Sequence, residues 1–226
     1  MNLIIGISAY NEEAMIKRVL NTLPRKLSGI SNLDIVLIDD GSVDKTGTIA
    51  KKLGVSVLTH IINRGLGGAL KTAFSYAKSK NYDILVTFDA DGQHDAKDIP
   101  KVILPILNNQ ADVVIGSRWF GDNNKPFSRY IINRLANIFT YLMYGIWTSD
   151  SQSGFRAFNK KAIRQINLIT DGMEVSSEIF KEIYRNKLSF TETPINVIYT
   201  DYSRKKGQQI QNAPNVLFQL LFRLIK

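Results

Sequence analysis

The 226-residue sequence contains no cysteine. This absence excludes a disulfide framework, a thiolate metal site and a cysteine nucleophile, and it is compatible with a reducing cytoplasm. Only two histidines are present, His60 and His94, which are too few for a metal site built from histidines. We expect His60, at the end of a predicted strand, to be structural. There is also no Gly-x-Ser-x-Gly motif, which excludes a nucleophile elbow of the hydrolase type.

Long hydrophobic runs are also missing. No stretch of about 20 uncharged apolar residues occurs, so we expect no membrane-spanning helix. The segment Met1 to Gly6 lacks a charged leader region, and it is typical of a first β-strand rather than a signal peptide. We see no internal repeat, low-complexity tract or interdomain linker. The sequence therefore predicts one domain over residues 1–226, with any membrane contact made from the side.

The charged residues are unbalanced, with 29 Lys and Arg against 20 Asp and Glu and a net charge of +9. A basic chain favours anionic partners such as phosphates, nucleic acid or acidic lipid headgroups. A nucleic-acid module is expected to interleave aromatic and basic residues on one face. Here the basic residues are scattered and the acidic clusters described below would repel nucleic acid, so we expect no nucleic-acid partner.

Apolar runs of strand length alternate with longer helical patterns over the first half of the chain. The expected strands are Leu3–Ser8, Asp34–Ile38, Val55–Leu58, Ile84–Phe88 and Val113–Ile115, and the expected helices are Glu12–Leu23, Asp44–Leu53, Leu66–Ser79 and Asp98–Leu107. This pattern predicts an α/β fold with a mainly parallel sheet covered by helices on both faces. Beyond Gly116 we expect helices over Ser128–Tyr144, Lys160–Ile166 and Glu174–Arg185, a strand over Phe190–Tyr199 and polar loops at Trp119–Phe127 and Thr200–Ala213.

Polar clusters follow four of the predicted strands. They are Ala9-Tyr10-Asn11-Glu12-Glu13, Asp39-Asp40-Gly41-Ser42, Asp89-Ala90-Asp91-Gly92-Gln93-His94 and Gly116-Ser117-Arg118. Ligands of open α/β sheets bind beyond the carboxyl ends of the strands. We therefore expect these clusters to meet at one ligand-binding edge.

The Asp89-Ala90-Asp91 cluster predicts a metal site. Residues two apart on an extended chain face the same side, so the two carboxylates repel each other unless a cation neutralises them. Oxygen ligands suit Mg²⁺ or Mn²⁺, which bridge to substrate phosphates, and Gln93 adds a third oxygen of the same parity. The alternative is an Asp-Gly turn with helix-capping acids. A calcium EF-hand loop is excluded, because His94 and Pro100 stand where it needs Gly and Glu.

The glycine-rich segment 63–72 matches neither of the two common phosphate loops. Leu70 stands where a P-loop needs glycine before Lys71, and also where the dinucleotide fingerprint needs its third glycine. Two interpretations remain for Gly65, Gly67 and Gly68. Their backbone N–H groups could bind an anion at a helix N-terminus, or the glycines could allow close packing of the helix.

Several arginines could bind phosphate, since the planar guanidinium suits bidentate recognition of an anion. They are Arg118, Arg129, Arg134, Arg156 and Arg204 in the run Arg204-Lys205-Lys206. Any one of them is more often a solvated surface charge. Arg118 is the exception, because it follows a predicted strand at the ligand-binding edge.

Taken in order, these motifs resemble the family 2 glycosyltransferases with a GT-A fold, and within them the dolichyl-phosphate mannose synthase-like group. The resemblance covers roughly Leu3 to Tyr199. It rests on Tyr10-Asn11-Glu12-Glu13, Asp39-Asp40-Gly41-Ser42, Asn63-Arg64-Gly65 with Gly67-Gly68, Asp89-Ala90-Asp91-Gly92-Gln93, Gly116-Ser117-Arg118 and Asp150-Ser151-Gln152-Ser153-Gly154-Phe155-Arg156.

The resemblance implies a role for each matching position. Residues 1–116 would form the nucleotide-sugar half, with Ala9, Tyr10, Glu12, Asp39, Asp40, Gly67, Asp89, Ala90 and Asp91 at the donor, and Asp91 and Gln93 on the metal. Residues 117–226 would form the acceptor half, with Arg118, Arg129 and Asn133 at an acceptor phosphate and Asp150, Gln152, Ser153 and Arg156 on the sugar side. Asp89, Asp91 and Arg118 are the expected catalytic residues. Arg204 and Lys205 would lie near the donor phosphates, although Arg204-Lys205-Lys206-Gly207 is followed by Gln208-Gln209 and departs from the usual Arg-x-x-Gly-x-Ser.

The resemblance also implies an activity. It is the inverting, Mg²⁺- or Mn²⁺-dependent transfer of a hexose from a UDP- or GDP-sugar to a dolichyl or polyprenyl phosphate, for protein glycosylation or cell-surface glycans. A lipid phosphate is already an anion and needs no strong general base, whereas a hydroxyl acceptor would need one near Asp150. The hydroxyl of a soluble or polysaccharide acceptor is the alternative. Nucleotidyltransferases share a similar fold, but they carry a glycine-rich loop with Arg and Lys after the first strand, where this chain has Tyr-Asn-Glu-Glu.

A lipid acceptor implies peripheral contact with the cytoplasmic face of a membrane. The helix from Ser128 and the apolar tail Val216–Lys226 are candidates for interfacial docking. The alternative for the tail is a helix that packs on the core.

Overall fold

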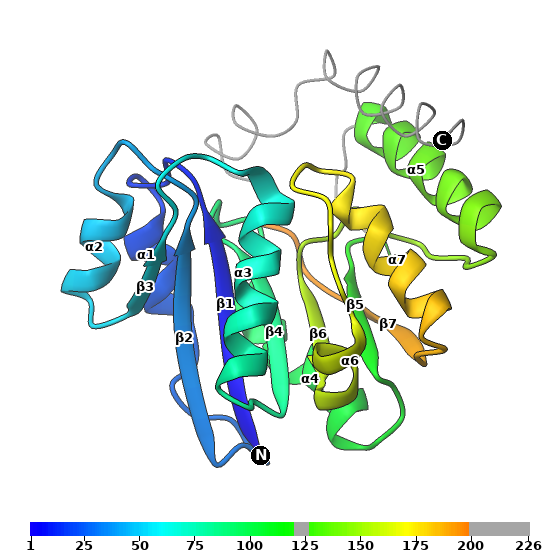
Figure 1. Cartoon of the computed structure of the whole chain (residues 1–226), viewed down its shortest axis with the longest axis horizontal. Coiled ribbons are helices and arrows are strands. Elements are labelled where there is room, and N and C mark those ends of the chain that lie inside the picture. The colour runs from blue at the N-terminus through cyan, green and yellow to red at the C-terminus, as the bar shows by residue number, and fades with distance from the viewer. Residues whose placement is uncertain (120–126, 199–226) are drawn as a thin grey trace.

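The computed structural model describes residues 1–119 and 127–198, with side chains at 127–132 left out of the description. One seven-stranded sheet forms its centre, in the order β3-β2-β1-β4-β6-β5-β7 (Figure 1). The strands are β1 (Asn2–Ala9), β2 (Asn32–Asp39), β3 (Ser56–Thr59), β4 (Ile84–Asp89), β5 (Val113–Ser117), β6 (Arg156–Asn159) and β7 (Phe190–Pro194). All pairings are parallel except those of β6, which runs antiparallel to both β4 and β5. The predicted mainly parallel sheet is confirmed.

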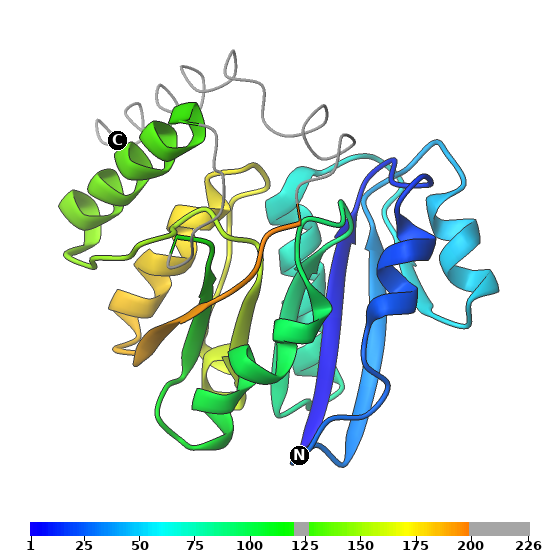
Figure 2. The ribbon, with the colours of Figure 1, turned by 180° about the vertical axis from the view of Figure 1, so that it is seen from behind.

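Helices cover both faces of this sheet. The helices are α1 (Ile16–Thr22), α2 (Thr46–Lys52), α3 (Gly65–Ser79), α4 (Ile99–Leu107), α5 (Phe127–Tyr144), α6 (Lys160–Gln165) and α7 (Val175–Arg185), with a 3₁₀ turn η1 at Ala96–Asp98. Helices α3, α6 and α7 lie on the face toward the viewer in Figure 1, and α1 and α4 lie on the opposite face seen in Figure 2. Helix α5 lies at the edge of the sheet where the parallel strands end, beside α7.

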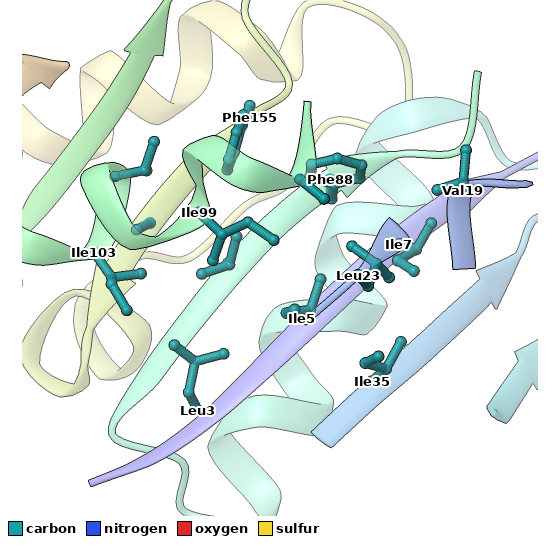
Figure 3. Packing of buried hydrophobic residues seen from close by; sticks show 14 of the residues in the cluster. Leu3, Ile5, Ile7, Val19, Leu23, Ile35, Phe88, Ile99, Ile103 and Phe155 are labelled. Carbon is teal, nitrogen blue, oxygen red and sulfur yellow. The ribbon is translucent and has the colours of Figure 1, made fainter. Parts of the chain in front are cut away.

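Strand β1 shows why the strands are apolar without interruption. Leu3, Ile5 and Ile7 belong to the hydrophobic cluster shared with α1 and α4 (Figure 3). Ile4 belongs to the cluster on the other face, together with Leu70 and Ala73 of α3. Because both faces of a parallel sheet are buried, both parities of the strand must be apolar, and the period-2 pattern of a half-exposed strand is absent.

Three elements differ from the sequence expectation by more than two residues. Strand β6 was not among the expected elements, because only four residues, Arg156–Asn159, pair between β4 and β5. Strand β7 ends at Pro194, which cannot donate a ladder hydrogen bond. Helix α1 begins at Ile16 instead of Glu12, because Asn11 has a left-handed φ of 53° and residues 12–15 form a turn against the β2–α2 loop.

Three further expectations concern regions that lie wholly or mostly outside the described residues. The loop expected at Trp119–Phe127 lies mostly there, as do the loop Thr200–Ala213 and the tail Val216–Lys226. Across the residues that the structure describes, no helix is long and apolar enough to cross a bilayer.

Asp112 directly precedes β5, at the edge of the sheet opposite the polar clusters. Its hydrogen bonds to neighbouring segments make the stability of this edge dependent on pH. Burial raises the pKa of Asp112, but hydrogen bonds from Lys161, Ser189 and Asn159 outweigh it and lower this pKa to about 2. A depressed folded-state pKa means that the stabilisation is present above pH 4 and is lost as the pH falls toward 2.

We expect Asp112→Asn to lower the free energy of unfolding at pH 7 by about 2 kcal/mol. The difference between the variant and the wild type should shrink between pH 4 and pH 2, as measured by urea denaturation at each pH. A difference that stays constant down to pH 2 would show that the charge of Asp112 is not what stabilises this edge.

Candidate functional site

The polar clusters meet at the carboxyl edge of the sheet because β1, β2 and β4 are parallel neighbours in register. Ala9 of β1 is level with Asp39 of β2, and Ser8 is level with Asp89 of β4. Strand β5 ends at the same edge but is separated from β4 by β6. The four polar clusters, including the one that contains Arg118, are thus brought to one edge of the sheet, as expected from the strand pattern.

The loops after β1 and β2 are tied to each other. The backbone N–H of Asn11 donates to Ser42 Oγ (2.9 Å), and the side-chain oxygen of Asn11 accepts from the Val43 N–H (2.9 Å). Nearby, the Glu12 N–H donates to Thr46 Oγ1 (2.8 Å), and the Glu12 side chain is buried. Tyr10, in contrast, is 43% exposed. The predicted donor residues Ala9, Tyr10, Glu12 and Asp39 therefore share one rigid pair of loops.

Asp40 is fully engaged with the segment between β3 and α3. Its carboxylate lies 2.6 Å from His60 Nδ1 and accepts from the backbone N–H groups of Arg64 (3.0 Å) and Gly65 (2.7 Å). The other ring nitrogen of His60 lies 2.8 Å from Thr72 Oγ1. His60 is thus a structural histidine, as expected. Asp40 orders the loop beside the predicted donor pocket, and its place in that pocket remains a prediction.

The glycine-rich start of α3 packs against the loop before α7. The N–H groups of Gly67 and Gly68 donate to the backbone oxygen of Asp171, at 2.8 and 3.3 Å. A Cβ on Gly67 would lie 2.2 Å from the backbone oxygen of Thr170, a contact that no side chain tolerates. Of the two interpretations left open by the sequence, close packing accounts for these glycines in this structure, and the predicted donor contact of Gly67 has no support from its N–H group.

Two carboxylates at the end of β4 and in the loop after it, Asp89 and Asp91, have pKa values shifted in opposite directions. Asp91 accepts from the backbone N–H of Gln93 (2.9 Å) and from its side-chain amide. Burial, together with the charge of Asp89, raises the pKa of Asp91. Burial also opposes ionisation of Asp89, but the hydrogen bond and charge of His94 and the charges of Arg118 and Arg156 outweigh it and lower the pKa of Asp89. A cation beside the pair would remove the repulsion that disfavours the charged form of Asp91.

His94 fixes the loop after β4 through its side chain and its backbone. Its Nε2 lies 3.1 Å from Asp89 Oδ2, and its ring packs against the rings of Phe88 and Phe155. His94 pairs with Val197 through a β-bridge, and the Gln93 carbonyl oxygen accepts from the Ile198 N–H (2.8 Å). The chain then continues toward Arg204 and Lys205, which lie outside the described residues.

The donor atoms of this loop fit a hard divalent cation. Among residues 1–119 and 127–198, no group of three or more histidine, aspartate or glutamate side chains could hold a metal by itself. Two carboxylates and the Gln93 amide are, however, all oxygen donors. Mg²⁺ and Mn²⁺ take such incomplete sets and fill the remaining positions with water and substrate phosphates. Asp89, Asp91 and Gln93 are therefore the residues that would hold the cation.

Gly154 is a residue of this site that the motif search did not single out by itself. A Cβ on Gly154 would lie 2.2 Å from Asp89 Oδ2 and 2.7 Å from Oδ1. The backbone oxygen of Gly154 accepts from Thr87 Oγ1 (2.7 Å), which holds it against β4. No local pattern could have identified this contact, because it joins segments 65 residues apart in the sequence. Glycine is needed here because the Asp89 carboxylate lies directly against its Cα.

We expect Gly154→Ala to displace Asp89 and to lower turnover by about 10- to 100-fold, since an ångström of misplacement at a reacting centre has effects of this size. The suitable control is Gly54→Ala, whose new Cβ meets nothing within 4 Å. Its left-handed φ of 75° should reduce stability by roughly 1 kcal/mol without changing turnover. Equal turnover in Gly154→Ala and the wild type would contradict the close contact.

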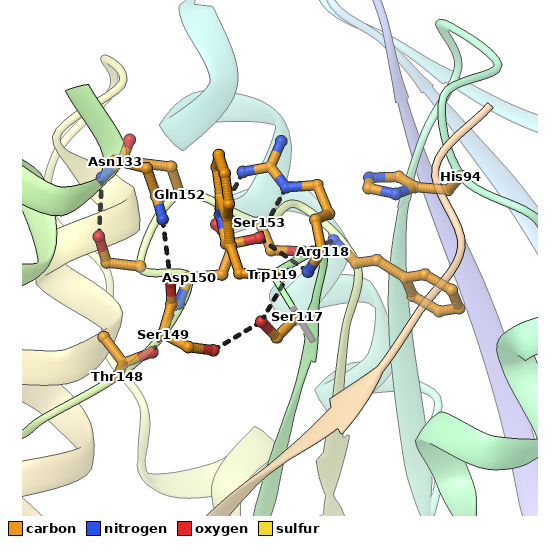
Figure 4. Close-up of polar contacts among 12 residues, drawn as sticks. His94, Ser117, Arg118, Trp119, Asn133, Thr148, Ser149, Asp150, Gln152 and Ser153 are labelled. Carbon is orange, nitrogen blue, oxygen red and sulfur yellow. Dashed lines mark hydrogen bonds and ion pairs between the residues drawn. The ribbon is translucent and has the colours of Figure 1, made fainter. Parts of the chain in front are cut away.

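Arg118 and Asp150 form the second half of the site. Arg118 Nε and Nη2 each donate to one oxygen of Asp150 at 2.7 Å, and the Arg118 backbone N–H donates to the same carboxylate at 3.1 Å (Figure 4). The Asp150 side chain is fully buried, whereas that of Arg118 is 24% exposed. The two residues were predicted at different parts of the acceptor half, and the structure joins them in one bidentate ion pair.

The remaining predicted acceptor-half residues are placed as follows. Arg156 is buried in β6 beneath the site, donates to the Ser151 carbonyl oxygen (2.9 Å) and lies over the ring of Phe180. Burial lowers the pKa of Arg156 to about 10, against the opposing charges of Asp150 and Asp89. At 2% exposure it offers no surface to a sugar, so the predicted sugar-side contact is not what this geometry shows.

Ser153 is also buried and accepts from the Phe155 N–H (3.3 Å), whereas Gln152 is partly exposed. Asn133 is buried in α5 and donates to the Ser149 carbonyl oxygen (2.9 Å). Arg129 lies one turn before Asn133 on α5, and its side chain is outside the description. The charges of Arg118 and Arg156 act on Asp89, and Arg118 pairs with Asp150, so arginines balance these two carboxylates within the described site.

Comparisons with known proteins agree with this arrangement. A sequence model described as "Glycosyl transferase family 2" matches residues 4–166. The chain is 45% identical over 98% of its length to the uncharacterised protein MJ1222 of Methanocaldococcus jannaschii, covering 91% of that protein. It is 38% identical over 95% of its length to the UDP-N-acetylglucosamine–dolichyl-phosphate N-acetylglucosaminyltransferase of Methanococcus voltae, covering 93% of that protein.

A solved structure with a similar fold is glucosyl-3-phosphoglycerate synthase from Mycobacterium tuberculosis in complex with phosphoglyceric acid. It has a TM-score of 0.74 and 18% sequence identity, with coverage of 98% of this chain and 79% of the other. At this identity the likeness concerns the fold alone.

Proposed function

The chain belongs to glycosyl transferase family 2, and from this premise we propose that it transfers a hexose from a nucleotide-sugar to a polyprenyl or dolichyl phosphate. The observation that carries the choice of acceptor is the Arg118–Asp150 pair. An acceptor hydroxyl needs a general base, and the expected position for one is near Asp150. Both oxygens of Asp150 are instead committed to Arg118. A phosphate acceptor is already nucleophilic and needs an arginine more than a base.

The residues of the predicted donor half favour a sugar donor that carries a nucleotide diphosphate. Tyr10 and Asp39 are the residues that we assign to the base and ribose. Tyr10 is 43% exposed, and the Asp39 carboxylate accepts from the Ser42 N–H in the loops that join after β1 and β2. A divalent cation held by Asp89, Asp91 and Gln93 would neutralise the charge that develops on the leaving diphosphate. His94 and the close approach of Gly154 keep Asp89 in place for this task. Mg²⁺ and Mn²⁺ both suit this oxygen set, and a structure of the mycobacterial fold neighbour contains Mn²⁺ and UDP.

The residues of the predicted acceptor half favour an anionic nucleophile that approaches from the side of α5. Arg118 is partly exposed and presents a fixed positive charge at the end of β5. Arg129 on α5 is the second predicted phosphate ligand. Preorganised positive groups of this kind stabilise an anion without reorganisation during the reaction. Attack from this side, opposite the leaving diphosphate, would invert the anomeric centre.

The outer face of α5 supports contact with a membrane. Leu135, Ile138 and Leu142 are 49%, 39% and 76% exposed and share one helical face by their spacing. Trp147, 54% exposed, packs against the ring of Tyr141 beside them. Exposed apolar and aromatic side chains of this kind suit the headgroup region of a bilayer. We place the chain at the cytoplasmic face of a membrane, where both a nucleotide-sugar and a lipid phosphate are available.

Transfer to the hydroxyl of a soluble or polysaccharide acceptor is the second candidate. The mycobacterial fold neighbour forms a glucosyl phosphoglycerate, which shows that the fold can serve a soluble acceptor. For this chain such an acceptor would require Asp150 to leave Arg118. The two candidates thus differ in whether the ion pair stays closed during turnover.

A donor panel separates these candidates. Labelled UDP-N-acetylglucosamine, UDP-glucose and GDP-mannose would be incubated with Mg²⁺ or Mn²⁺, with and without a polyprenyl or dolichyl phosphate in detergent. Label that enters the organic phase with one donor supports the proposal. Metal-dependent release of the nucleotide with no label in lipid from any donor would contradict the acceptor and keep the glycosyltransferase.

A further inference from the structure

A buried polar contact joins α5 to the loop that carries Asp150. Asn137, only 5% exposed, uses both ends of its side-chain amide on this loop. Its nitrogen donates to the Ser149 carbonyl oxygen (2.7 Å), and its oxygen accepts from the Ser151 N–H (2.9 Å). One side chain thus bonds the backbone on both sides of Asp150, in the manner of a neighbouring β-strand.

The loop is held from its other side by Glu192 of β7. One carboxylate oxygen accepts from Thr148 Oγ1 (2.6 Å) and from the Ser149 N–H (2.8 Å). The hydroxyl of Ser149 also lies 2.6 Å from that of Ser117, the residue before Arg118 (Figure 4). Glu192 and Ser117 fix the loop to the sheet, whereas Asn137 fixes it to α5. The backbone at Asp150 therefore has one position relative to both elements.

The position of this backbone decides where Arg118 points. Asp150 is fully buried and accepts three N–H groups of Arg118, from the backbone, Nε and Nη2. A shift of the Asp150 backbone would carry the guanidinium with it, because a buried carboxylate cannot give up its partner without a large penalty. The chain of contacts runs from α5 through Asn137 and Asp150 to Arg118.

Helix α5 also carries the second predicted phosphate ligand. Arg129, Asn133 and Asn137 are spaced by four residues, so they occupy successive turns of one helical face. The opposite face carries the exposed apolar residues Leu135, Ile138 and Leu142. If α5 moved relative to the sheet, the distance between Arg129 and Arg118 would change, unless a contact made the Asp150 loop move together with α5. Asn133 supplies a single bond to Ser149, while Asn137 bonds both flanks of Asp150.

We propose that Asn137 is a positioning residue that locks the Asp150 loop to α5, so that Arg118 and the α5 ligand of an acceptor phosphate are held at a fixed separation. This role rests on the proposed function, because it matters only if an anionic acceptor binds between β5 and α5. Asn137 touches neither substrate and acts through Asp150. It should therefore affect use of the acceptor and leave the donor half unchanged.

The test compares Asn137→Ala with Thr140→Val. Thr140 is a buried polar residue of the same helix whose hydroxyl donates to the Ala136 carbonyl oxygen within α5, so its loss leaves the loop untouched. With a polyprenyl phosphate as acceptor, Asn137→Ala should lower kcat/KM for the lipid by about 10- to 100-fold. The KM for the nucleotide-sugar should stay within about twofold of the wild type, and Thr140→Val should match the wild type in both. Hydrogen exchange should accelerate at the Ser151 amide in Asn137→Ala alone.

A second variant guards against loss of the fold. Asn137→Ser leaves space and a hydroxyl for a water molecule to bridge Ser149 and Ser151, and it should give an intermediate loss of kcat/KM. Faster exchange at Ser151 together with wild-type kinetics for the lipid would overturn the positioning role. Equal increases in KM for donor and acceptor would overturn it as well. Failure of the wild type to glycosylate any lipid phosphate would instead contradict the proposed function itself.

Discussion

Replacing Asp91 with asparagine is expected to reduce sugar transfer by roughly 10³-fold or more, because it removes one of the two charges that we propose hold a cation at the donor diphosphate. The fold should not suffer. Burial and the charge of Asp89 raise the pKa of Asp91, which means that the folded protein disfavours the charged form. A neutral asparagine relieves this repulsion, so the free energy of unfolding at pH 7 should be equal to that of the wild type or higher. Loss of activity combined with retained or increased stability is typical of a functional charge.

Asp95→Asn is the matched control for this variant. Asp95 lies in the same loop, where its carboxylate caps the turn η1 by accepting from the Lys97 N–H (3.0 Å), and asparagine caps equally well. We expect wild-type transfer and wild-type stability. The measurements are initial rates over a titration of Mg²⁺ or Mn²⁺ and urea denaturation without metal. If the Asp91→Asn variant kept its activity but lost stability, Asp91 would have a structural role in the loop and no role in binding a metal.

Replacing Arg118 with lysine is expected to lower kcat/KM for the lipid phosphate by roughly 10²-fold. Lysine keeps the charge, but it cannot donate in parallel to both oxygens of Asp150 while facing a phosphate. The KM for the nucleotide-sugar should change little, since the donor half lies on the other side of β6. Stability should fall by about 1–3 kcal/mol, because the buried Asp150 keeps only part of its hydrogen bonding.

The control for this prediction is Arg134→Lys. Arg134 is an exposed arginine of α5 that lies over the ring of Trp147, with its guanidinium carbon 5.9 Å from the ring centre. Its replacement should leave kcat/KM for the lipid within about twofold of the wild type. If Arg118→Lys lost stability but kept the wild-type KM and kcat for the lipid phosphate, Arg118 would be a structural partner of Asp150 and not an acceptor ligand.

The fold and the ligand edge could be predicted from the sequence because they depend on local patterns. Strands buried on both faces are apolar without interruption, and the residues that follow them must meet at one edge of a parallel sheet. Asp39, Asp89 and Arg118 were found in this way. The oxygen ligands that we propose for a cation were predicted from the parity of Asp89, Asp91 and Gln93.

The contacts that position these residues could not be predicted, because they join distant segments. The pairing of Arg118 with Asp150, the close approach of Gly154 to Asp89 and the bond from Asn137 to Ser151 depend on the antiparallel strand β6. Strand β6 lies between β4 and β5 in the sheet, and its four residues are too few for a strand to be recognised from the sequence. Gly67 illustrates the same limit, since only the structure distinguishes packing against Thr170 from binding of an anion.

The most direct test of the account is the chemical identity of the lipid product. After incubation with a nucleotide-sugar, a divalent cation and a polyprenyl phosphate, mass spectrometry of the organic phase should show the lipid phosphate increased by one glycosyl residue. Mild acid should release the sugar and return the unmodified lipid phosphate, since the new bond joins the anomeric carbon to a phosphate oxygen. A lipid phosphate of unchanged mass, together with a glycoside of a soluble hydroxyl acceptor that resists mild acid, would contradict the lipid phosphate as acceptor and require Asp150 to act as the base.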